Sequence, residues 1–212
     1  MILTALDIGD LSQVALVFDG HLAAEAPWAR AAFARIMASA DLAAGGVDTP
    51  AHRAQAVALA QAFGMATLDE EPAVAFSWDG RVLRCRSESY VIVHEVAHYL
   101  VAPPQRRFLL DFGLGAGPET GRVEEAEAVA CVDFATRETE ETLASLLGIL
   151  WEVEMGQPGI AAFLEQNWLE GYARASAARH FARFLTLLVD GGFCDPSGRP
   201  TPPAALLPLI AA

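Results

Sequence analysis

Two histidines four residues apart are the side chains of this sequence best suited to chemistry. They stand in the run His94-Glu95-Val96-Ala97-His98. Residues four apart share one face of a helix, so both imidazoles can reach a single cation. Glu95 follows the first histidine and can contact a water molecule held by that cation. This HExxH spacing is typical of metal sites in which two histidines hold the ion and the glutamate acts as general base.

The flanking sequence predicts a buried helix around the two histidines. Ser87 or Ser89 can cap this helix, and a double proline must end it. Glu95 is the only charged residue between Val91 and Val101. A buried glutamate is costly unless a partner compensates its charge, and a cation is such a partner. The alternative interpretation is that two core histidines happen to lie four residues apart.

A third metal ligand has to come from another segment, because the HExxH helix supplies only two. The predicted helix from Val123 to Ala135 contains three glutamates, Glu124, Glu125 and Glu127. At 100° per residue, Glu127 falls on the apolar stripe of this helix, where a carboxylate needs a partner. The other two fit a second interpretation, acidic residues placed favourably at a helix N-terminus. We therefore expect Glu127 as the third ligand, with Glu124 as the fallback.

The segment around the motif resembles a known family. The stretch HEVAHYLVAPPQRRFLLDFG, His94 to Gly113, is similar to the bacterial elongation factor P hydroxylase family, in which an Arg-Arg pair and Asp-Phe-Gly follow the HExxH helix. The corresponding residues here are Arg106, Arg107, Asp111, Phe112 and Gly113. The later EEAEA run, Glu124 to Ala128, resembles the second acidic stretch of that family. It also resembles the Glu-Ala element of compact HExxH peptidases of the ImmA type. Both resemblances place the third ligand at Glu127.

Two enzyme classes and one structural role fit these residues. The resemblance implies a metal-dependent hydroxylase of a protein side chain, with Fe(II) as the metal and modified elongation factor P as the substrate. The spacing alone favours a zinc-dependent metallopeptidase in which Glu95 is the general base. A structural metal clamp ranks last, because structural zinc sites usually have four protein ligands. Asp111 is expected to orient a histidine ligand, and Arg106 and Arg107 to bind a carboxylate or pair with nearby acids.

The composition limits the class of protein. A chain of 212 residues with 53% hydrophobic content can form one well-packed domain, which we expect over residues 1–212. The net charge of −13 argues against binding to nucleic acid. Three widely spaced cysteines favour reduced thiols, and the first residues do not look like a signal peptide. No apolar run has membrane-spanning length. A cytoplasmic protein is expected.

The periodicity predicts a mostly helical α+β domain, zincin-like, with a small hairpin or sheet beside the HExxH helix. Helices are expected over Leu11–Ala23, Pro27–Ala43, Pro50–Gly64, Glu140–Val153, Gly159–Glu165 and Leu169–Val189. Asp79-Gly80 predicts a hairpin turn between strands at 73–78 and 81–86. This hairpin either offers an edge to an extended peptide or only covers the helical core. The Pro-rich tail, residues 195–212, is expected to be extended.

Overall fold

The computed structural model describes residues 10–72, 77–116 and 123–210. The fold is mostly helical with a small two-stranded sheet, so the predicted α+β class is confirmed. The chain divides into two compact units, Met1–Val47 with Ile149–Thr201 and Asp48–Gly148 with Pro202–Ala212. No helix of the described residues combines the length and the apolar character needed to cross a bilayer.

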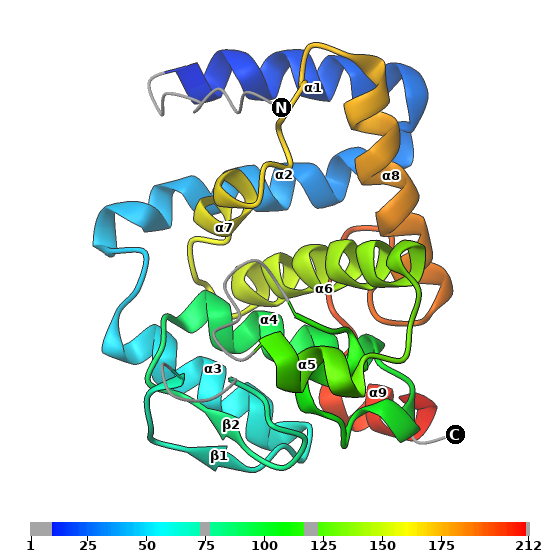
Figure 1. Ribbon diagram of the computed structural model, residues 1–212. Helices are drawn as coiled ribbons and strands as arrows, with labels where there is room; N and C mark the ends of the chain where they lie inside the picture. Colours follow the sequence, from blue (N-terminus) through cyan, green and yellow to red (C-terminus); the bar gives the residue numbers. More distant parts are fainter. Residues whose placement is uncertain (1–9, 73–76, 117–122, 211–212) are drawn as a thin grey trace. The chain divides into compact units, whose positions relative to one another are not determined.

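The first unit is a helical bundle with an aromatic core. Its helices are α1 (Leu11–Glu25), η2 (Pro27–Ala29), α2 (Arg30–Ala38), η3 (Ser39–Gly45), α7 (Ile160–Glu165) and α8 (Ala175–Asp190). The rings of Phe18, Phe33, Phe163 and Phe181 pack together and are at most 2% exposed. Helices α1 and α8 pack against each other, and Figure 1 shows α8 crossing one end of α1. The predicted α1 is therefore confirmed, whereas α8 begins at Ala175 instead of Leu169.

The second unit contains the HExxH helix. Its elements are α3 (Pro50–Ala62), β1 (Thr67–Leu68), β2 (Leu83–Arg84), α4 (Ser89–Val101), η5 (Pro104–Arg106), η6 (Leu110–Gly113), α5 (Val123–Val129), the start of α6 (Phe134–Glu154) and α9 (Pro203–Ile210). Helix α3 packs on α4, as Figure 1 shows. The start of α3 is as predicted, because the Thr49 hydroxyl accepts the backbone N–H of His52 and Pro50 is the first helical residue.

The sheet differs from the predicted hairpin. β1 and β2 are parallel, with Thr67 opposite Leu83 and Leu68 opposite Arg84. The predicted turn is present, since the Asp79 carboxylate accepts two backbone N–H groups and Trp78 forms an antiparallel bridge to Leu83. Residues 73–76 of the predicted first strand lie outside the described residues. β1 was not predicted, because a strand of two residues carries no periodic signal.

Several helix boundaries also differ from the predictions. Neither Ser87 nor Ser89 caps α4 with its side chain; instead the Asp48 carboxylate accepts the Ser89 N–H at 3.0 Å. Helix α5 ends at Val129 rather than Ala135. Part of the tail that we expected to be extended, Pro203–Ile210, forms α9, whereas residues 195–202 are not helical. Proline is compatible with the first turn of a helix, and the alanines and leucines that follow are good helix formers.

Candidate metal centre

Helix α4 brings the two histidines of the motif together. Their Nε2 atoms are 2.9 Å apart, and the two rings meet edge to face with a centroid distance of 4.5 Å. The His98 side chain is 6% exposed and that of His94 is 26% exposed. The sequence prediction of this pair is therefore matched by its geometry: the four-residue spacing places both rings on one face of the helix.

The carboxylate beside the two imidazoles belongs to Glu141 on α6. Its Oε2 atom lies 3.3 Å from Nε2 of His98 and 3.7 Å from Nε2 of His94. Among the described residues, these three form a group whose possible ligand atoms all lie within 4.8 Å of one another. Glu141 was missed by the sequence analysis.

Small residues on α6 let its backbone approach α4. Gly148 lies two turns beyond Glu141, and a Cβ added there would be 3.5 Å from the Cα of His94. Ala144, between them, is fully buried. Positions 141, 144 and 148 share one face of a helix. A glutamate on the same face as two small residues is therefore the sequence pattern that could have indicated Glu141. A carboxylate on such a face can reach a neighbouring helix.

The distances fit a shared divalent cation. With metal–ligand bonds of about 2.0–2.1 Å, neighbouring ligand atoms of a tetrahedral or octahedral site are about 2.8–3.4 Å apart. The separations of 2.9 and 3.3 Å fall within that range, and the third, 3.7 Å between His94 and Glu141, is slightly longer. Two ring nitrogens this close must share a proton or face a common cation, because their lone pairs repel. His94 and Glu141, whose side chains are 26% and 42% exposed, form the open side of the site.

Glu95 lies beside this group without a full set of partners. Its Oε2 atom is buried and has no hydrogen-bond partner among the described residues. Burial, together with Asp111 and Glu141, raises the pKa of Glu95 to about 8, although His98 and a hydrogen bond from Ser77 act in the opposite direction. A nearby cation would favour the ionised form. The orphaned oxygen is thus suited to accept a proton once a cation is present.

The pKa values of the two histidines are shifted in opposite directions. Burial and the neighbouring His98 hold the pKa of His94 below its usual value. Burial also opposes charge on His98, but the Glu141 carboxylate raises the pKa of His98 above its usual value. Although burial alone would raise it, hydrogen bonds from the two imidazoles hold the pKa of Glu141 well below its ordinary range. An ionised carboxylate facing imidazole nitrogens is a suitable donor set for a divalent metal ion.

A left-handed turn covers the buried histidine. Asp111, Phe112 and Gly113 all have positive φ (47°, 53° and 71°), a conformation that costs energy for the two non-glycine residues. The turn holds the Phe112 ring parallel to His98, with ring centroids 5.5 Å apart and planes inclined by 19°. The Trp78 ring in turn stacks on Phe112, with ring centroids 5.9 Å apart. The turn therefore shields His98 from water.

Asp111 was expected to orient a histidine. It lies close enough to influence the charge of His98, and burial raises its own pKa. No hydrogen bond joins it to either histidine, although all three residues are described. The contact with the imidazole comes from the neighbouring Phe112 ring instead.

The two arginines serve mainly to hold the surrounding loops. Arg106 donates to the backbone oxygen of Phe112 at 3.1 Å and pairs with Glu140, the residue beside Glu141. Arg107 donates to the backbone oxygens of Ala102 and Ile210. Both arginines are less than 10% exposed. Pairing with a nearby acid, one of the two expected roles, is therefore seen for Arg106.

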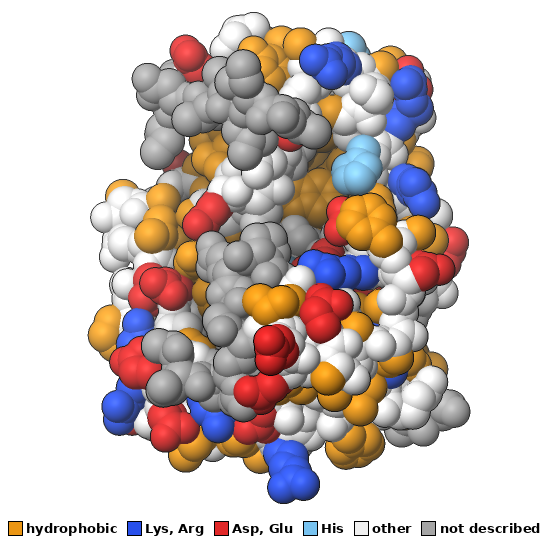
Figure 2. Space-filling model, in the orientation of Figure 1, with side chains coloured by type: hydrophobic (Ala, Val, Ile, Leu, Met, Phe, Trp, Pro, Cys, Tyr) orange, Lys and Arg blue, Asp and Glu red, His pale blue; other side chains and the backbone are white. Residues whose placement is uncertain are grey.

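The structure does not bring Glu127 or Glu124 to the imidazoles. Both are exposed on α5, and Glu127 accepts the backbone N–H of Ala116 at 2.9 Å. The apolar stripe assumed one helix from Val123 to Ala135, but α5 ends at Val129 and Phe134 begins α6. Because Phe134 is 74% exposed, the stripe that singled out Glu127 does not exist as a buried face. Figure 2 shows acidic side chains gathered on the surface over α5.

Comparison with family models, with curated proteins and with solved structures finds no match to this chain.

Proposed function

We propose that the chain is a metal-dependent hydroxylase of a protein side chain, of the elongation factor P hydroxylase type. His94, His98 and Glu141 would hold one divalent metal ion. The main observation in support of the proposal is the position of the Asp111–Gly113 turn beside His98. Residues beyond HExxH on which the family resemblance rests form the wall of the site, with Phe112 stacked on His98. A generic metallopeptidase does not require that turn.

The set of donors supports this reaction class. Two imidazoles and one carboxylate on one side of an ion leave coordination positions open, the arrangement used by Fe(II) oxygenases. Iron in such a site supplies the activation of O₂. The chain's own residues enclose His98 behind Phe112 and Trp78 and leave His94 and Glu141 on the open side. A substrate side chain would approach from that side.

The charge of the chain supports a cationic substrate. The net charge is −13, and Glu124, Glu125 and Glu127 are all exposed on α5. Acidic surfaces attract positively charged partners over about a Debye length. A modified lysine on a cytoplasmic protein such as elongation factor P has that charge.

Mass spectrometry of modified elongation factor P tests this proposal. The protein substrate is incubated with enzyme loaded anaerobically with Fe(II), and then exposed to O₂ and a reductant. We expect the substrate to gain one oxygen atom with wild-type enzyme and with Glu127→Ala, and no gain with Glu141→Ala. Substrate that stays unmodified by iron-loaded wild-type enzyme contradicts the proposal.

A zinc-dependent metallopeptidase is the second candidate, and Glu95 favours it. The buried Oε2 atom without a partner is where a general base toward water would stand. In a peptidase, Glu95→Gln should reduce the rate by about 10²–10⁴-fold, the usual contribution of a positioned base. In a hydroxylase the same change should act mainly through metal geometry. Zinc-dependent cleavage of a peptide that Glu95→Gln abolishes, without oxygen transfer by the iron form, would reverse our ranking.

A further inference from the structure

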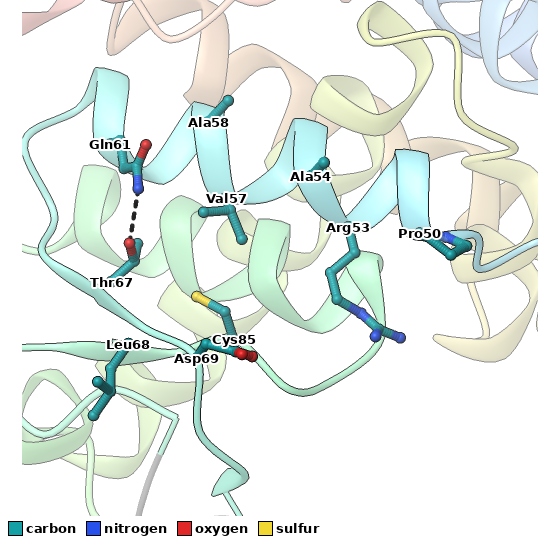
Figure 3. Close-up of a pocket in the computed structure, with 10 residues that line it drawn as sticks. All are labelled: Pro50, Arg53, Ala54, Val57, Ala58, Gln61, Thr67, Leu68, Asp69 and Cys85. Atoms are coloured by element: carbon teal, nitrogen blue, oxygen red, sulfur yellow. Dashed lines mark hydrogen bonds between the residues drawn. The ribbon is translucent and has the colours of Figure 1, made fainter.

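The second unit has a groove that is separate from the candidate metal ligands. It lies between α3 and the strands, has a volume of about 420 Å³, and is drawn in Figure 3. We call it the α3–β1 groove. Ala54, Val57 and Ala58 of α3 and Leu68 and Cys85 from the strand side line its apolar part. The volume falls within the range of ligand pockets in proteins, and its small side chains leave room for apolar groups of a ligand.

One side of the groove is the free edge of the sheet. Leu83 donates its N–H to Ala66, and Cys85 donates to Leu68, so residues 66 and 68 point their carbonyls toward β2. In a parallel pair the alternate residues point their backbone groups away from that partner. Thr67 and Asp69 are those residues, and no backbone hydrogen bond of either is found within the described residues. Unpaired N–H and C=O groups at an edge are a template for another strand.

The two ends of the groove are polar, and one of them holds an arginine that is paired with an aspartate. At one end Gln61 donates to the Thr67 hydroxyl at 2.9 Å, as the dashed line in Figure 3 marks. At the other end Arg53 pairs with Asp48 through Nη2, while its Nε atom is buried without a hydrogen-bond partner among the described residues. Asp69 also faces this end, but Arg86 holds its carboxylate through two hydrogen bonds of 2.9 and 3.2 Å.

We propose that the α3–β1 groove binds an extended peptide segment of a partner protein, which adds to β1 as a new strand. Backbone groups of the peptide would pair with Thr67 and Asp69, apolar side chains would contact Val57 and Ala58, and an acidic side chain would bind Arg53. Strand addition beside a helix gives affinity through the main chain and specificity through the groove. This binding goes beyond the proposed hydroxylation and requires no metal ion.

A labelled hexapeptide tests the proposal on the full chain without metal. The probe is fluorescein-Glu-Val-Thr-Val-Thr-Val-amide, followed by fluorescence anisotropy. Six singly N-methylated forms are compared with the parent peptide. Three carry the methyl group at alternate residues, whose N–H groups point to one edge of a strand. The other three carry it at the remaining residues, whose N–H groups point to the opposite edge. Only one edge of a strand pairs with β1, and that edge offers two carbonyl groups, so we expect one or two forms of one set to lose affinity by up to about tenfold, for one lost hydrogen bond each, and the other set to bind like the parent.

Variants of the groove provide the matched controls. Ala58→Trp fills the groove from an exposed position, whereas Ala62→Trp adds the same ring to α3 outside it. We expect only Ala58→Trp to abolish binding. Wild type should bind the parent peptide more tightly than a peptide in which Gln replaces Glu. Arg53→Gln should bind the two peptides equally. Circular dichroism checks that each variant is folded.

Three results would overturn the proposal. One is that no peptide of the series binds up to about 1 mM, the weak limit of specific recognition. Another is equal binding of both N-methylated sets. The third is that wild type is a dimer and Ala58→Trp is a monomer, because the groove would then hold a second copy of this chain. None of these results bears on metal binding or on hydroxylation.

Discussion

Among single residues, Glu141 is the side chain that most favours a charged His98. Its carboxylate raises the pKa of His98 against the effect of burial, while His94, flanked by that imidazole, stays below its usual value. Replacement of Glu141 by Gln keeps the shape of the side chain but removes the charge. We expect the pKa of His98 to fall in Glu141→Gln, because the variant loses the largest effect that opposes burial, while the smaller effects of Glu95 and Asp111 remain.

Nuclear magnetic resonance of the imidazoles measures this change. The ring resonances of His94 and His98 are followed with pH in metal-free wild type, in Glu141→Gln and in Glu127→Gln as the control. Glu127 is exposed and accepts the backbone N–H of Ala116, so the two histidines should titrate in Glu127→Gln as they do in wild type. The placement of Glu141 would be contradicted by a His98 pKa that is the same in all three proteins.

The difference between Glu127 and Glu141 shows which metal ligands could be predicted from the sequence and which could not. His94, Glu95 and His98 were predictable, because their geometry depends on the period of one helix. The third carboxylate depends on which of two later helices approaches α4. That choice follows from packing around Gly148, not from any local pattern. The prediction of Glu127 depended on a continuous helix face, which does not exist because α5 ends at Val129.

At the scale of elements, the approach of α6 to α4 depends on Gly148. A Cβ at this position has its nearest neighbour at 3.5 Å, an ordinary contact, so Gly148→Ala should fit. Alanine in a helix interior gains about 0.5–1 kcal/mol over glycine. We expect urea unfolding to show Gly148→Ala to be as stable as wild type or more so, with unchanged metal affinity.

Gly148→Leu is the matched larger variant. Its side chain has no room against the backbone of His94, so α6 must move away and carry Glu141 with it. We expect lower stability and weaker metal binding together. If Gly148→Leu binds metal as tightly as Gly148→Ala, the close packing of α6 does not position Glu141.

The elements themselves were predictable to unequal degrees. α1 and α3 have clear periodicity or a Thr-Pro start, and the structure confirms them. The turn at Asp79 was recognisable from its chemistry. β1 and the break between α5 and α6 were not, because a two-residue strand and a short interruption are decided by tertiary contacts. The helix α9 was hidden by its prolines.

At the scale of the whole molecule, the first unit contains a buried acid whose titration should govern its stability. Burial, reinforced by Glu165, raises the pKa of Glu152 to about 8. The unfolded chain releases this proton near pH 4.5, the usual pKa of a glutamate, whereas the folded chain keeps it up to about pH 8. The folded state therefore binds more protons in this window, and its stability falls as the pH rises.

Glu152→Gln removes that penalty. Relative to wild type, we expect its free energy of unfolding to rise by up to about 1.4 kcal/mol for each pH unit between the two pKa values, with little difference at pH 4. Urea unfolding at pH 4, 6 and 8 measures it. Glu170→Gln, at an exposed position in the same unit, is the control and should follow wild type. Parallel curves for Glu152→Gln and wild type would show that the acid is ionised in the folded protein.

We have proposed that His94, His98 and Glu141 together bind one divalent ion. Metal content measured by elemental analysis after anaerobic purification tests it most directly, in wild type, Glu141→Ala and Glu127→Ala, each checked for its fold by circular dichroism. We predict one equivalent of iron or zinc in wild type and Glu127→Ala, and almost none in Glu141→Ala. A full equivalent in Glu141→Ala, or its loss in Glu127→Ala, would contradict the account.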